Sequence, residues 1–380
     1  MNTFLALCLF TQLIQDVSDS VPPSEETVAR ASVLIKVLQQ SGRIPPEFSE
    51  EARDKLAAMG VDVLPMILLG MKDQPENIMG MLQSAGDEIA SHATKDSVAL
   101  PMSYLEKFAA HERQQPEARR AAIRWADQQD PGIRDRFLSK HINDDVFRLE
   151  AVDAAIATGR KQCQDGQIDA ARKTLQSAFD AVRSPDQAIC ISEELKTLSV
   201  SVSLLAQLGI VSHWRAIGPF PWTASDGFAK QWPPERQNDS EESCSVNNQE
   251  FEWHDAVSES QGIIQTFGRL APGDHDSIVY AHTTISSEAA QSVELRVGAV
   301  GRLEVRINGE TVISGDSDWP RLQHDQVRTN VKLQAGKNRI LVKLGAMRIN
   351  TAPDAPIPPA QFSVRFVNDS GAGIQFDGVN

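Results

Sequence analysis

Three side chains in one short stretch have the types that proteins use to hold a sugar, namely Trp319, Arg321 and Asp325. An aromatic ring can stack on the apolar face of a pyranose, while a guanidinium and a carboxylate can exchange hydrogen bonds with its hydroxyl groups. The stretch is polar, and we expect a loop between two strands. A tryptophan that only covers the end of a sheet would explain the same residues. Trp222 is a weaker surface candidate of the same kind.

Motifs of enzyme active sites are missing from the sequence. It contains no G-x-S-x-G, H-E-x-x-H, Walker loop, G-x-G-x-x-G or C-x-x-C pattern. The densest polar group surrounds His275, beside a Pro-Gly turn, and favours a solvated loop over a metal site. Carboxylates are numerous, but no pair stands out as the two that glycosidases need. We therefore predict a chain that is not an enzyme and has no cofactor or metal. A hydrolase with unrecognised carboxylates is the least favoured alternative.

Two other groups of residues have reactive or charged side chains. Asp144 and Arg148 lie four residues apart, and we expect them to form an ordinary ion pair within a helix. Cys163 and Cys190 fit either small core residues or, in an exported protein, a disulfide. Cys244 is expected in a polar loop without a partner. The cysteine spacing does not fit a metal site.

These residues need elements to position them, and residues 24–209 have the pattern of helices. Apolar residues recur three and four positions apart after Ser24, which can cap the first helix. The stretch 56–65, with Gly60 and the pair Leu64-Pro65, resembles the joint of a HEAT repeat. The segment 166–209 fits a TPR-like helix pair equally well. We predict an irregular helical-repeat domain, because short helix pairs bury their apolar faces only by stacking on neighbours.

The pattern changes near Trp214, where short β-branched runs between turn residues replace the helical spacing. The clearest turn is Asn308-Gly309, which is typical of a two-residue type I′ hairpin. The expected strands are 277–285, 292–297, 303–307, 311–313, 327–333, 339–344 and 361–367. Several short strands without intervening helices predict an antiparallel β-sandwich over residues 213–368.

This half resembles the galactose-binding-like jelly roll. The resemblance rests on the runs 214–221 and 233–235, on Trp253, on 280–281, on 303–310 and on 333–344. It is similar to modules that accompany β-galactosidase-like enzymes and that occur in exported planctomycete-type proteins beside helical repeats. The resemblance implies a jelly roll and a carbohydrate ligand, with Trp214 and Trp232 in the core. The loop 298–301 departs from the family, because it has no acidic residue where members often carry one.

The ends and the charge complete the prediction. Residues 1–20 have the apolar core of a secretory signal, so we expect an exported protein without a membrane span in the mature chain. Residues 369–380 are expected to be a flexible tail. The net charge of −14 disfavours nucleic acid. We predict a binding or scaffold protein whose sandwich binds a glycan and whose helices bind a protein. A purely structural or interaction protein without a small ligand is the alternative.

Overall fold

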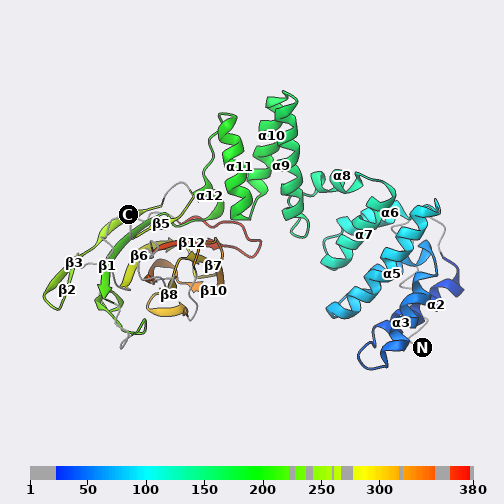
Figure 1. Cartoon of the computed structure of the whole chain (residues 1–380), viewed down its shortest axis with the longest axis horizontal. Coiled ribbons are helices and arrows are strands. Elements are labelled where there is room, and N and C mark those ends of the chain that lie inside the picture. Colours follow the sequence, from blue (N-terminus) through cyan, green and yellow to red (C-terminus); the bar gives the residue numbers. More distant parts are fainter. Residues whose placement is uncertain are drawn as a thin grey trace, which may run out of the picture. The chain divides into compact units, whose positions relative to one another are not determined.

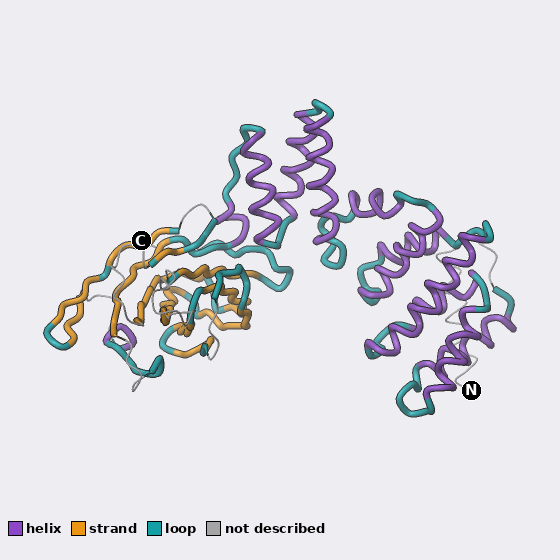
Figure 2. Tube along the Cα trace, viewed as in Figure 1, coloured by secondary structure: helices purple, strands orange, loops and turns teal. Residues whose placement is uncertain are grey.

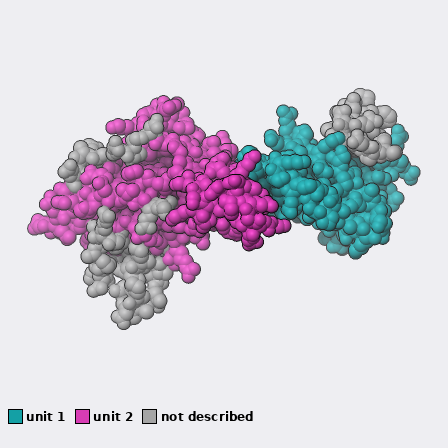
Figure 3. Space-filling view, turned by 90° about the horizontal axis from the view of Figure 1, so that it is seen from above, with its two compact units in different colours: residues 1–157 teal, residues 158–380 magenta. Residues whose placement is uncertain are grey.

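The structure is a computed structural model. It describes residues 23–221, 227–236, 243–258, 261–266, 277–315, 320–346 and 360–376. The predicted signal 1–20 lies outside the described residues, and so do Trp222, Trp319 and the loop around His275. The chain divides into two compact units, residues 1–157 (unit 1) and 158–380 (unit 2) (Figure 3). No helix of the described part is long and apolar enough to cross a membrane.

Unit 1 is built from helices (Figure 1). They are α2 (Glu25–Leu38), α3 (Pro46–Ala57), α4 (Leu64–Gly70), α5 (Glu76–Lys95), α6 (Met102–Ala110), α7 (Pro116–Gln129) and α8 (Ile133–Lys140). As predicted, the Ser24 side chain caps α2 by accepting a hydrogen bond from the Thr27 amide at 3.2 Å. Glu25 and Glu26 in the first turn favour the positive end of the helix dipole. The helices confirm the predicted fold class, whereas the helical-repeat interpretation stays a prediction.

The core of unit 1 centres on Trp125, whose side chain is fully buried. Its indole nitrogen donates to the Asp87 carboxylate at 2.6 Å. Gly86 lies against the ring so closely that a Cβ at this position would come within 2.1 Å of it. Glycine is therefore needed at this position because α5 and α7 pack with the ring between them.

Unit 2 begins inside helix α9 (Arg148–Gln164), well before the boundary that we predicted at residues 209–213. It includes α10 (Ile168–Ala181), α11 (Pro185–Thr197) and α12 (Leu204–Leu208). Backbone hydrogen bonds tie the end of α12 to the sandwich, since the Phe366 amide donates to the Gly209 carbonyl at 3.1 Å. These contacts join residues far apart in the sequence, so the helical pattern alone does not show that the last helices belong with the strands.

The rest of unit 2 is antiparallel β-structure, coloured orange in Figure 2. Its strands are β1 (His213–Pro221), β2 (Ser243–Val246), β3 (Gln249–Glu252), β4 (His254–Val257), β5 (Ile264–Gln265), β6 (Ser277–Ser287), β7 (Gln291–Ala299), β8 (Arg302–Ile307), β9 (Glu310–Ile313), β10 (Val327–Leu333), β11 (Gly336–Ala346) and β12 (Gln361–Val367). Every strand that we expected is present. Strands β2 to β5 are short and were not predicted, although Trp253, one of the resembling residues, lies between β3 and β4.

Two sheets form the sandwich. The strand order is β4-β1-β6-β11-β8-β9 in one and β10-β7-β12-β5 in the other. Alternate side chains of both sheets fill the space between them, and Trp214 packs edge to face on Phe362 within this core. A second cluster, with Phe220, Trp232 and Tyr280, covers the outer face of the larger sheet. Trp214 and Trp232 are therefore core residues, as predicted.

Asn308 and Gly309 connect β8 and β9 with positive φ angles of 50° and 88°. Ile307 pairs with Glu310, so the loop has two residues, as in the predicted type I′ turn. A Cβ at Gly309 would meet no atom within 4 Å. The requirement for glycine at this position is therefore one of backbone conformation and not of space.

Replacing Gly309 by valine should lower the unfolding free energy of unit 2 by about 1–3 kcal/mol, because a β-branched residue is strained at positive φ. Urea unfolding followed by fluorescence measures this change. Gly309→Asn is the matched control, since asparagine tolerates the left-handed region, and it should cost clearly less. Equal midpoints for Gly309→Val and the unaltered chain would contradict the turn type.

Three sequence predictions need correction, and the alternative left open for two cysteines is resolved. Asp144 pairs with Arg119 and not with Arg148, whose guanidinium instead contacts Asp145 at 2.6 Å. Cys163 and Cys190 are not bridged. Cys244 is buried on β2 beside Phe251 and does not lie in a polar loop. Residues 369–376, predicted as part of a tail, fold back, and the Ile374 amide donates to the Phe366 carbonyl at 2.8 Å.

Candidate functional site

The predicted sugar-binding residues are only partly within the described chain, because Trp319 and Trp222 lie outside it. Arg321 is exposed, and its carbonyl oxygen accepts a hydrogen bond from the Gln326 side chain at 2.9 Å. The Asp325 side chain, in contrast, is only 6% exposed. The structure therefore gives Arg321 and Asp325 different surroundings, although they are close in the sequence.

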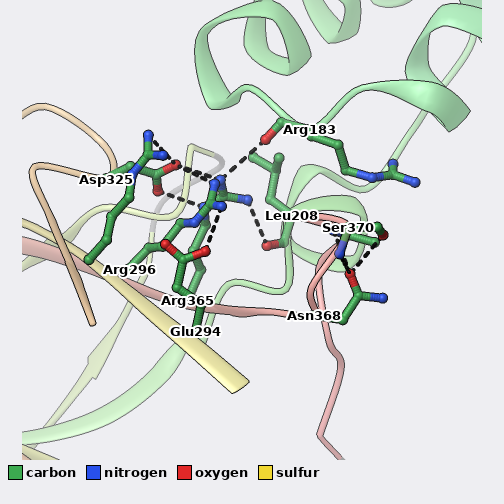
Figure 4. A network of polar contacts seen from close by, with 10 residues as sticks. Arg183, Leu208, Glu294, Arg296, Asp325, Arg365, Asn368 and Ser370 are labelled. Atoms are coloured by element: carbon green, nitrogen blue, oxygen red, sulfur yellow. Dashed lines mark hydrogen bonds and ion pairs between the residues drawn. The ribbon is translucent and has the colours of Figure 1, made fainter. Parts of the chain in front are cut away.

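Asp325 lies at the centre of an ion-pair network on the outer face of the smaller sheet (Figure 4). Its carboxylate accepts from the Arg365 guanidinium at 2.7 and 2.5 Å and from Arg296 at 3.2 Å. Arg296 and Arg365 are directly opposite each other on β7 and β12. Two cations at such positions repel each other, and the carboxylate between them removes the repulsion.

The charge of Asp325 is maintained by these partners. Burial alone would raise its pKa, but the hydrogen bonds and charges of Arg365 and Arg296 outweigh burial and hold the pKa below the usual range of an aspartate. Arg365 also donates to the carbonyl oxygens of Arg183 at 3.2 Å and Leu208 at 3.3 Å. The network thus fixes the segment after α10 and the end of α12 on the sheet. We had expected Asp325 to contact sugar hydroxyls, but its carboxylate faces arginines.

A second buried polar cluster lies on the outer face of the larger sheet around Glu235, whose side chain is 1% exposed. Its carboxylate accepts from the Tyr280 hydroxyl at 2.5 Å and the Lys343 ammonium at 2.9 Å, and Arg306 lies 2.6 Å away. Burial, and then the hydrogen bond to Glu235, raise the pKa of Tyr280 well above its usual range. Each of these charged side chains has a partner of opposite charge within the cluster. Because Glu235 precedes β2 and its partners lie on strands of the larger sheet, the cluster holds the segment before β2 on that sheet.

Unit 2 also has a cavity of about 360 Å³, which lies beside α12. We call it the α12 cavity. Its walls come from the start of α12, the segment leading into β1, strand β6 and the end of the described chain. The polar residues that line it are Ser203, Ser212, His213 and Gln375, and the large apolar residues are Leu205, Ile210, Ile285, Ile374 and Phe376.

Local contacts hold this lining in place. The Ser212 hydroxyl and a ring nitrogen of His213 are 2.9 Å apart, and His213 is exposed. The Phe376 ring is perpendicular to Phe366, with 5.3 Å between their centroids. A volume of this size fits a small ligand. The aromatic ring can contact the apolar part of an amphipathic ligand, and the hydrogen-bonding groups can contact its polar part.

Sequence reasoning missed this cavity because its residues come from segments without a recognisable motif. Phe376 falls in the predicted tail, and His213 and Ser212 fall at the predicted boundary between domains. A signal did exist, since Ile374 and Phe376 alternate with a polar residue after a strand. This pattern indicates an extended segment with one apolar face.

Among the residues that the structure describes, no group of His, Cys, Asp and Glu side chains could hold a metal ion. No family model matches the sequence, and no curated protein matches it either. Several solved structures are similar. One is the PA14 domain of the antifreeze protein MpAFP, with 15% identity and a TM-score of 0.19. The alignment covers 28% of this chain and 57% of that one.

Two further structures are similar over longer stretches. The PA14 sugar-binding domain from an RTX adhesin has 12% identity and a TM-score of 0.24, over 45% of this chain and 95% of that one. Beta-glucosidase from Kluyveromyces marxianus in complex with glucose has 9% identity and a TM-score of 0.27. That alignment covers 80% of this chain but only 37% of the enzyme.

The prediction that the chain is not an enzyme is corrected on this comparison, because an enzyme is among the structures to which the chain is similar. TM-scores of this size carry no argument about a reaction or a ligand. The chain is therefore described by its own architecture, helices followed by an antiparallel β-sandwich.

Proposed function

We propose that unit 2 binds a carbohydrate in the α12 cavity and that the protein does so after export. The observation that supports this proposal is the composition of the cavity wall, where the Phe376 ring and aliphatic side chains alternate with hydroxyl, imidazole and amide groups. The export part rests on the apolar segment within residues 1–20.

The chemistry of a sugar matches such a wall. A pyranose has C–H groups on its faces and hydroxyls on its edge, so it needs apolar and polar contacts at once. The polar contacts replace hydrogen bonds to water and add little, whereas covering the exposed part of an aromatic ring removes apolar surface from water. We therefore expect Phe376 to contribute most to the free energy of binding. His213 and Gln375 would form hydrogen bonds with the sugar hydroxyls and so determine which sugar binds.

A glycan array followed by titration calorimetry tests the proposal. The full chain should bind at least one saccharide with a dissociation constant in the millimolar to micromolar range, or about −4 to −8 kcal/mol. Phe376→Ala should weaken this binding at least tenfold. Phe48→Ala is the matched control, because Phe48 is 57% exposed on α3 in unit 1 and outside the cavity. An equal loss of saccharide affinity in both variants, or no loss in either, would count against binding in the α12 cavity.

The stretch from Trp319 to Arg321, predicted from the sequence, is a second candidate for the same function. Trp319 lies outside the described residues, so its role in stacking stays a prediction. Trp319→Ala in the same titration separates the two places. A loss with Trp319→Ala but not with Phe376→Ala would move the ligand from the cavity to this loop.

Protein binding by the helices of unit 1 is a second candidate function. Val33 on α2 and Phe48 on α3 are 60% and 57% exposed, and the two helices pack on each other. Exposed apolar side chains mark a protein contact where they form one patch, and this candidate requires Val33 and Phe48 to do so. The candidate predicts that α2 and α3 exchange their amide hydrogens more slowly when a partner is bound.

A further inference from the structure

A second cavity of unit 2 has a different chemistry. It measures about 410 Å³ and lies between α11, the segment that follows it and Gln261. We call it the α11 cavity. Its aliphatic lining residues, which we call the aliphatic floor, are Ile189, Val200, Val202 and Leu204, and Ser192, Ser199, Ser201 and Gln261 also line it. None of the described residues that line it is aromatic, so this part of the chain supplies no stacking surface of the kind on which the carbohydrate proposal depends.

Two opposite charges stand at this cavity. Glu193 and Lys196 both line it and both are exposed. They lie three residues apart on α11, which places them on the same side of the helix. Within the described chain neither side chain takes part in an ion pair, whereas the adjacent Glu194 pairs with Arg160 at 2.7 Å. A carboxylate and an ammonium group are therefore available side by side above an aliphatic floor.

We propose that the α11 cavity binds a zwitterionic α-amino acid with an aliphatic side chain. Lys196 would hold its carboxylate, Glu193 would hold its ammonium group, and the aliphatic floor would take the side chain. Each charged contact is a charge-assisted hydrogen bond, which is stronger than a neutral one. The site goes beyond the carbohydrate proposal and does not depend on it, because the two cavities share no lining residue.

Calorimetric titration of the full chain with L-leucine tests the site. L-leucinamide keeps the ammonium but has no carboxylate, and N-acetyl-L-leucine keeps the carboxylate but has no ammonium group. Both charges are required by the proposal, so each analogue should bind at least tenfold more weakly than L-leucine. Equal binding of all three compounds, or no binding of L-leucine, would overturn the proposal.

Variants assign the binding to the two side chains. Lys196→Glu and Glu193→Lys should each weaken L-leucine binding at least tenfold and leave the circular dichroism spectrum unchanged. Lys173→Glu is the matched control, since Lys173 is an exposed residue of α10 that does not line the cavity, and it should bind as the unaltered chain does. Binding that survives both cavity variants would contradict the site. Saccharide binding should be the same in all three variants.

Discussion

Replacing Asp325 by alanine should lower the unfolding free energy of unit 2 by about 3–5 kcal/mol. The substitution leaves Arg365, whose side chain is 3% exposed, without its carboxylate. Arg296 lies directly opposite and keeps only the Glu294 carboxylate at 2.8 Å, so the two guanidinium groups share one negative charge fewer. Removing one partner of a buried ion pair has a cost of this order because the remaining charge is desolvated and uncompensated. The segment after α10 and the end of α12 should also lose part of their attachment, since Arg365 donates to the carbonyl oxygens of Arg183 and Leu208.

Urea unfolding monitored by tryptophan fluorescence measures this loss, because five of the six tryptophans belong to unit 2. Asp369→Ala is the matched control, because it removes the same charge from a side chain that is exposed. It should leave the midpoint unchanged. A midpoint for Asp325→Ala equal to that of this control would contradict the role of the network.

The same residue predicts a pH dependence. The pKa of Asp325 is lower in the folded chain than in the unfolded one, so its ionised form favours folding. This contribution is complete above the ordinary value of about 3.9 and is lost as the pH falls through the lower folded value. The stability difference between the unaltered chain and Asp325→Asn should therefore shrink on acidification below about pH 4.

The second large effect concerns Glu235. Glu235→Ala should lower the unfolding free energy by about 3–5 kcal/mol, because it leaves the Lys343 ammonium, only 3% exposed, buried without its carboxylate. The double variant Glu235→Leu with Lys343→Met should regain much of this loss, since apolar residues of similar size remove the uncompensated charge.

Chemical denaturation of the single and double variants makes this comparison. Glu252→Ala on β3 is the matched control, because that side chain is exposed. A double variant that is less stable than Glu235→Ala would show that charge pairing does not maintain the cluster.

The strands that could be predicted share one property. In β8 and β10 apolar and polar residues alternate because one face packs inside the sandwich and the other does not. Strands β2 and β3 have four residues each, which is too short for such a pattern to stand out. The burial of Cys244 was missed for this reason.

The sites were harder to predict than the fold. Asp325 meets Arg296 and Arg365, which are 29 and 40 residues away, and Glu235 meets Lys343 across 108 residues. A carboxylate in a polar stretch has the same local sequence whether it faces a ligand or a buried guanidinium. The register of β7 against β12 distinguishes the two cases, and the sequence does not specify that register locally.

Methyl NMR on the chain labelled at isoleucine provides the most direct test of carbohydrate binding in the α12 cavity. Ile210, Ile285 and Ile374 line this cavity, and Ile189 lines the α11 cavity and is the internal control. Titration with the saccharide that binds best on the array should shift the signals of the first three residues and leave that of Ile189 in place. Shifts that spare all three, at saccharide concentrations where calorimetry records binding, would contradict the account.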